Sequence, residues 1–113
     1  NGAALAFGSG FPVGGANPFA GWATAISRED AAGQPPGGWH GDERLTREQA
    51  WRGYTGGAAY AAFAEKVYGR LAPGQRADFI IVDRDPLLAT PAELRTTRVD
   101  ETWVGGEKVF ERK

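Results

Sequence analysis

The sequence predicts an α/β segment followed by a β segment, which together make an α+β chain when the chain is taken alone. Three observations support this fold class. An apolar run at Ala3–Phe7 ends in glycines, as a buried strand does before a tight turn. Apolar residues then recur at helical spacing as far as Gly69. Beyond Gly69, β-branched runs and the pair Gly105-Gly106 predict strands and a hairpin.

Length and charge narrow the classes of function. The chain has 113 residues, enough for one small domain, and 42% of them are hydrophobic, so a core can form. Its 13 basic and 14 acidic side chains leave a net charge of -1, which gives no strong field for nucleic acid or anionic lipid. No apolar run approaches the roughly 20 residues of a transmembrane helix. We therefore expect no nucleic-acid partner and no membrane partner.

Cysteine and methionine usage bear on the origin of the chain. The sequence contains no cysteine, which excludes disulfides and thiolate metal sites and agrees with a reducing compartment. Residues 1–5 lack the basic region of a signal peptide, so we expect a cytoplasmic location. A secretory leader removed from a longer precursor is the alternative. Because methionine is absent even at position 1, we expect the chain to be an excerpt of a longer protein.

The first helix is predicted to begin at Asn17-Pro18, with Asn17 as N-cap and Pro18 in the first helical position. It should end between Ser27 and Asp30, before a loop over residues 31–44 that is rich in glycine and proline. Four apolar residues fall on one face of this helix: Phe19, Trp22, Ala23 and Ile26.

Two further helices are predicted before Gly69. Thr46 and Gln49 have the spacing of a capping box and start the first of them. Gly56-Gly57 should break it, and a second short helix is expected at about Ala58–Val67. Since this second helix is apolar nearly all round, most of it should be buried.

The β segment begins with a turn at Pro73-Gly74, which the side chain of Asp78 is placed to tie. Both faces of the strand Phe79–Val82 are apolar, so we expect it inside a sandwich rather than at an exposed edge. A short helical turn at Pro91–Leu94 follows. The runs Val99–Val104 and Glu107–Arg112 should form the hairpin strands.

Five phrases in the chain resemble the C-terminal part of the amidohydrolase superfamily, in the branch called amidohydrolase family 3. The most specific is Gly69–Asp83, which resembles the join between the barrel and a small β domain in that family. The others, in chain order, are Phe7–Ser9 with Phe11–Val13, Leu45–Ala50, Tyr54–Tyr60 and Trp103–Phe110. The resemblance covers nearly the whole chain.

The resemblance implies the last strand–helix unit of a TIM-like barrel over residues 1–69 and the C-terminal share of a small β-sandwich domain over residues 70–113. It implies a longer, metal-dependent hydrolase that acts on non-peptide carbon–nitrogen bonds in an amide, cyclic amide or N-acyl substrate. It also implies that the longer protein binds one or two divalent metal ions, with zinc as the expected metal. The chain alone is expected to be inactive. Its expected partners are the rest of the barrel and, in the longer protein, a small-molecule substrate; a homo-oligomer is a further possibility.

The family carries a catalytic aspartate after the last barrel strand, and here that position is Gly10. We therefore assign no catalytic residue and no metal ligand to this chain. Its one histidine, His40, does not make a zinc site, which needs at least three protein ligands. The resemblance implies that five residues lie at the rim of a substrate pocket: Ser9, Phe11, Pro12, Trp39 and His40.

Other interpretations of these motifs are weaker. Gly8-Ser9-Gly10 does not fit a dinucleotide-binding turn, because Val13 stands where the third glycine belongs. Ser9 does not fit the G-x-S-x-G pattern of a nucleophile elbow, because Phe7 and Phe11 stand where its two glycines belong. Asp83 and Asp85 precede Pro86 and suit a strand-ending turn better than acid–base catalysis. The alternative function is a non-catalytic α+β association module that has lost the metal site.

Overall fold

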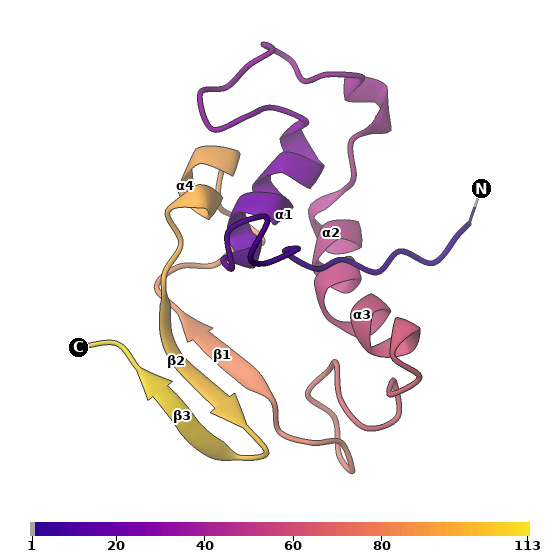
Figure 1. Cartoon of the computed structure of the whole chain (residues 1–113), viewed down its shortest axis with the longest axis vertical. Coiled ribbons are helices and arrows are strands. Elements are labelled where there is room, and N and C mark those ends of the chain that lie inside the picture. The colour runs from indigo at the N-terminus through magenta and orange to yellow at the C-terminus, as the bar shows by residue number, and fades with distance from the viewer. Residues whose placement is uncertain (1) are drawn as a thin grey trace. The chain divides into compact units, whose positions relative to one another are not determined.

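The computed structural model describes residues 2–113 (Figure 1). The chain forms two compact units, which are described separately. The first contains the residues up to Phe7 together with Arg52–Arg84 and Arg98–Lys113, and the second contains Gly8–Trp51 and Asp85–Thr97. Elements follow in the order α1 (Pro18–Ser27), η1 (Gly41–Glu43), α2 (Arg47–Tyr54), α3 (Gly56–Ala61), β1 (Phe79–Val82), α4 (Pro91–Arg95), β2 (Val99–Val104) and β3 (Glu107–Glu111). The predicted division at residue 69 concerns domains of a longer protein and stays a prediction.

Helix α1 is the centre of the second unit and begins as predicted. The Asn17 side chain accepts a hydrogen bond from the Phe19 backbone N–H at 2.9 Å, and Pro18 is the first helical residue. The helix ends at Ser27, because Arg28 turns into the left-handed region with φ 56°. Of the face predicted to be apolar, Phe19, Trp22 and Ala23 are buried.

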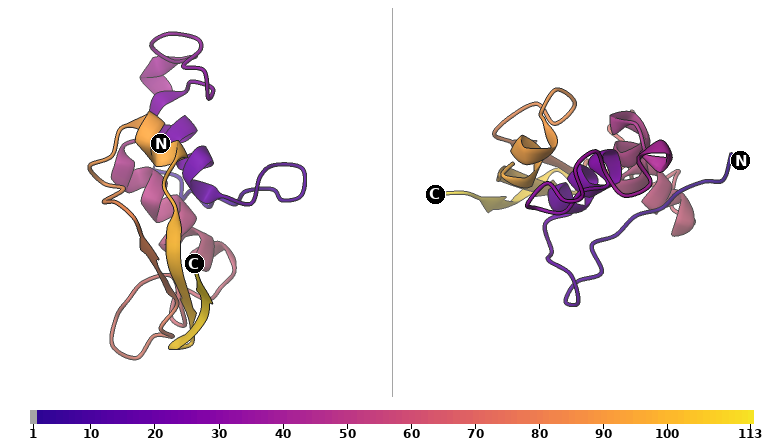
Figure 2. Two further views of the ribbon diagram at one scale, coloured as in Figure 1. Left: turned by 90° about the vertical axis from the view of Figure 1, so that its left-hand side faces the viewer. Right: turned by 90° about the horizontal axis from the view of Figure 1, so that it is seen from above.

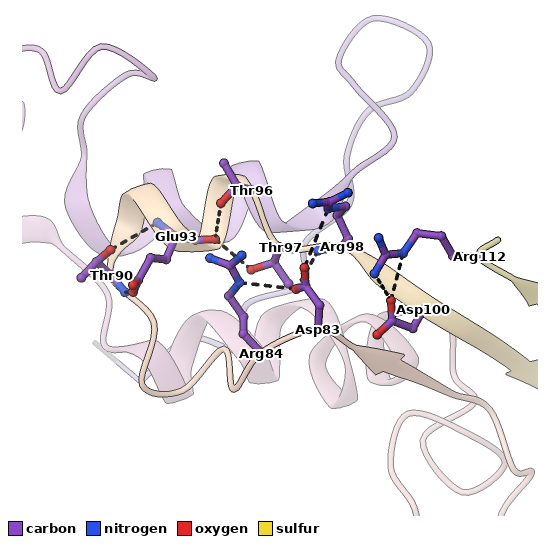
Figure 3. A network of polar contacts seen from close by, with 9 residues as sticks. All are labelled: Asp83, Arg84, Thr90, Glu93, Thr96, Thr97, Arg98, Asp100 and Arg112. Atoms are coloured by element: carbon purple, nitrogen blue, oxygen red, sulfur yellow. Dashed lines mark hydrogen bonds and ion pairs between the residues drawn. The ribbon is translucent and has the colours of Figure 1, made fainter.

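Helix α4 packs against α1 within the same unit (Figures 1 and 2). Leu94 on α4 is fully buried, and the Arg95 guanidinium donates to the Glu29 carbonyl at 2.7 Å and to the Thr24 hydroxyl at 3.1 Å. The start of α4 is a capping box between Thr90 and Glu93 (Figure 3). The helical turn predicted at residues 91–94 is therefore confirmed and extends to Arg95.

The predicted capping box at the start of α2 is also present. The Thr46 backbone N–H donates to the Gln49 side chain at 2.9 Å, and the Gln49 N–H donates back to the Thr46 hydroxyl at 3.1 Å. Between α1 and α2 the chain follows the predicted loop, apart from the single 3-10 turn η1. The Leu45 N–H ties the end of this loop to the Ala25 carbonyl at 3.0 Å.

Helix α3 differs from its prediction. It covers Gly56–Ala61 rather than 58–67, and Ala59 is its buried residue. Phe63 has φ 56° and is 95% exposed, while Val67 is 51% exposed, so the expectation of a mostly buried helix was wrong. An apolar helix stays buried only when another layer covers it, and the described residues supply no such layer over Phe63 and Val67.

The predicted strand at Ala3–Phe7 is also wrong for this chain. The segment forms no strand, although the Phe7 N–H donates to the Gly53 carbonyl at 2.9 Å and the Phe7 ring meets Tyr54 edge-on at 5.3 Å. Strand geometry is maintained by a ladder with a neighbouring strand. Among residues 2–113, the three strands of the sheet pair only with one another.

The first unit contains an antiparallel sheet in the order β1-β2-β3 (Figure 1). The predicted hairpin is confirmed, and its turn residues Gly105 and Gly106 have φ 60° and 82°, as a type I′ turn requires. Strand β1 is confirmed in position but lies at an edge of the described sheet, where Ile80 and Ile81 are 44% and 45% exposed. The described residues form a single sheet layer, so its predicted place inside a sandwich of the longer protein stays a prediction.

Asp78 joins the turn before β1 to the hairpin turn. Its carboxylate accepts from the Gly105 N–H at 2.9 Å and from Arg76 Nε at 2.8 Å. The predicted Pro73-Gly74 turn is present, closed by the Gln75 N–H on the Ala72 carbonyl at 3.0 Å. Asp78 thus ties the distant hairpin rather than the Pro73-Gly74 turn, a pairing that arises only on folding.

This arrangement predicts an acid-sensitive contribution to stability. The Arg76 side chain, and then the Gly105 N–H, lower the pKa of Asp78. Because the folded pKa lies below the unfolded value of about 3.9, the contribution is full above that value and is lost as the pH falls through the folded pKa. We expect Asp78→Asn to remove this part of the acid-induced loss, measured as the urea midpoint against pH. Glu107→Gln, which makes the same change of charge on exposed β3, should retain the wild-type profile.

Candidate functional site

The turn over Ser9–Gly14, in the second unit, contains three of the predicted pocket-rim residues. The Gly10 carbonyl accepts from the Val13 N–H at 2.9 Å and from the Gly14 N–H at 3.2 Å. The Ser9 hydroxyl accepts from the Phe11 N–H at 3.3 Å, so this oxygen is used within the turn. A Cβ on Gly14 would lie 2.6 Å from the Ser9 carbonyl oxygen, so the closure of the turn needs glycine. Figure 2 shows the loop before α1 projecting away from that helix.

Gly10 stands where the family resemblance places a catalytic aspartate. Its φ is +66°, in the left-handed region that aspartate and asparagine adopt more readily than most residues. A Cβ placed on Gly10 would meet no atom within 4 Å. The turn therefore has room for a carboxylate, but Gly10 itself offers neither a metal ligand nor a proton acceptor.

Trp39 and His40 lie on the loop that follows α1. The Trp39 ring is 62% exposed, and the Arg28 guanidinium lies over it at 5.2 Å. Arg28 Nε also donates to the Trp39 carbonyl at 2.5 Å, and the His40 ring meets the indole edge-on at 4.3 Å. Arg28 is paired with Glu43 at 3.7 Å. This cluster holds the loop against the C-terminal end of α1.

A shallow cavity of about 230 Å³ lies beside the cluster and is lined by Thr24, Ala25, Arg28 and Trp39. Trp39 therefore lines a cavity, while its predicted place at a substrate-pocket rim stays a prediction. Sequence reasoning did not identify Arg28, whose one signal was its position just after a predicted helix end. Within the described chain, no hydrogen bond or ring contact joins the Ser9–Gly14 turn to Trp39 or His40.

The residues present do not fit the metal centre that the family resemblance implies. Among residues 2–113 there is no group of three or more histidine, cysteine, aspartate or glutamate side chains placed to hold a metal ion. The His40 ring packs on Trp39, and Gly10 has no side chain that could bind a metal. No hydrolytic step can be derived from these side chains alone.

The carboxylates that follow β1 have structural partners instead. Asp83 accepts from the Arg98 backbone N–H at 3.1 Å, and Arg84 and Arg98 lie beside it (Figure 3). The Arg98 N–H is the largest cause of a lowered pKa at Asp83. Asp85 accepts from the Leu87 N–H at 2.8 Å. Asp85 therefore ties the turn after β1, as predicted, whereas Asp83 joins the end of β1 to Arg98, the residue before β2.

Within residues 2–113, none of the helices is long and apolar enough to cross a bilayer.

Comparison with known proteins decides the family. A family model described as "Amidohydrolase family" matches residues 1–110. This chain belongs to the amidohydrolase family. The resemblance to family 3 is thereby confirmed over nearly the full length of the chain.

Curated relatives of this amidohydrolase chain are all much longer. It is 37% identical over 89 residues to N-substituted formamide deformylase of Arthrobacter pascens, covering 79% of the chain and 16% of that protein. It is 31% identical over 105 residues to YtcJ of Bacillus subtilis (strain 168), named as an amidohydrolase, covering 93% of the chain and 20% of YtcJ. Protein LONG AFTER FAR-RED 3 of Arabidopsis thaliana is 33% identical over 111 residues, covering 96% of the chain and 18% of that protein. The chain thus spans a fifth or less of each relative.

A solved structure supports the fold assignment. The amidohydrolase from Thermotoga maritima MSB8 matches 63% of this amidohydrolase chain and 17% of its own, with a TM-score of 0.53 and 21% identity. At this identity the likeness concerns the fold alone, as part of a larger amidohydrolase chain.

Proposed function

We propose that this chain is the C-terminal part of a metal-dependent hydrolase that cleaves a non-peptide carbon–nitrogen bond in a small amide, cyclic amide or N-acyl compound. The observation that carries the proposal is the family match over residues 1–110. The 37% identity to a protein named N-substituted formamide deformylase favours N-substituted formamides as the first substrates to test. Coverage of 16–20% of the relatives supports metal ligands outside the described residues.

In this proposal the chain supplies the frame of a pocket rather than its chemistry. The segment Ala3–Phe7 becomes the last strand of a TIM-like barrel once neighbouring strands pair with it, because its side chains are apolar and a strand is maintained by a ladder with its neighbours. Residues 70–113 form the C-terminal share of a small β sandwich. Ser9, Phe11 and Pro12, with Trp39 and His40, contribute to the pocket rim.

Gly10 limits what the whole protein does at this turn. A bound divalent metal, zinc in our proposal, would lower the pKa of its water and polarise the amide carbonyl. Because Gly10 provides no carboxylate, the group that takes up the proton must lie outside this turn. We place the protein in the cytoplasm, with a small-molecule substrate and the remaining barrel segments as its partners.

The test compares the chain alone with the longer polypeptide encoded with it. Both are incubated with a panel of N-substituted formamides, cyclic amides and N-acyl compounds, and the product is measured as the released amine or, for a cyclic amide, as the ring-opened acid. The longer protein should hydrolyse at least one class, lose that activity to a chelator and regain it with Zn²⁺, while the chain alone stays inactive. Absence of any metal-dependent hydrolysis by the longer protein would contradict the proposal.

A second candidate, a non-catalytic α+β association module, is favoured by Gly10 together with exposed apolar residues. Phe63, Leu71 and Val109 are 95%, 68% and 61% exposed, and each is a large apolar side chain that association with a partner would cover. Metal analysis of the longer protein separates the two candidates. A stoichiometric divalent ion supports the hydrolase, whereas a metal-free, inactive protein that still associates supports the module.

A further inference from the structure

We draw no further inference here: the strongest candidate, the shallow cavity at the C-terminal end of α1 that is lined by Thr24, Ala25, Arg28 and Trp39, lies in a chain that spans a fifth or less of each relative, and nothing in the structure shows what fills or covers it.

Discussion

Leu94→Ala is expected to lower the free energy of unfolding of the second unit by about 2–5 kcal/mol, the cost of removing a buried leucine side chain. Leu94 is 0% exposed and lies on α4 where that helix packs against α1. The surrounding residues are held by the Thr90–Glu93 capping box and by Arg95, so they are poorly placed to collapse into the space left behind. Urea denaturation followed by tryptophan fluorescence, with Trp22 buried in the same unit, gives the measurement.

The control for this variant is Leu88→Ala. Leu88 precedes α4 and is 81% exposed, so its truncation should change stability by no more than about 0.5 kcal/mol. Equal losses at Leu88 and Leu94 would mean that α4 does not pack on α1 as described. A small loss at both positions would show that the second unit has no fixed core.

Gly57→Ala is expected to destabilise the first unit by about 1–3 kcal/mol, the usual range for an overpacked site. A Cβ at Gly57 would lie 2.1 Å from the Leu5 carbonyl oxygen and 3.0 Å from the Arg52 carbonyl oxygen. Both neighbours are backbone atoms, so relief requires movement of a whole segment. We expect residues 3–7 to be displaced from α3, with loss of the Phe7–Gly53 hydrogen bond.

The adjacent glycine supplies a matched control. A Cβ at Gly56 meets no atom within 4 Å, and the residue is the first of α3. Gly56→Ala should therefore be neutral or stabilising by up to about 1 kcal/mol, through helix propensity alone. We expect Gly57→Ala to lower the free energy of unfolding and Gly56→Ala to leave it unchanged or raise it, measured by urea denaturation and by proteolysis of the N-terminal segment. An equal loss of stability in both variants would contradict the contact between Leu5 and Gly57.

Elements specified by local chemistry were predictable from the sequence. Asn17-Pro18 starts α1, and Thr46 with Gln49 starts α2, because each side chain satisfies backbone N–H groups only a few residues away. Gly105-Gly106 predicts the hairpin because the turn needs positive φ at both positions. The role of Asp85, which accepts from the Leu87 N–H two residues along, follows from the same local logic.

Elements that depend on a covering layer were not predictable in this way. The segments 3–7 and 58–67 are apolar enough for a buried strand and a buried helix, yet the first forms no strand and the second is largely exposed. Hydrophobic patterning predicts that a surface will be buried, but it does not show whether a segment that covers it is present. The cluster of Arg28 with Trp39 also escaped prediction, because its two residues are eleven positions apart and meet only through a left-handed turn at Arg28.

The sequence by itself determined the family resemblance, the helix starts, the hairpin and the absence of a carboxylate at Gly10, since each follows from residue identity and short-range bonding. Only the tertiary structure decided that Asp78 reaches Gly105, that Leu94 is the fully buried residue of α4, and that β1 is an edge. The physical reason is the distance along the chain between the residues that interact. A cap or turn is satisfied within a few residues, whereas burial and strand pairing depend on which distant segments are present to meet.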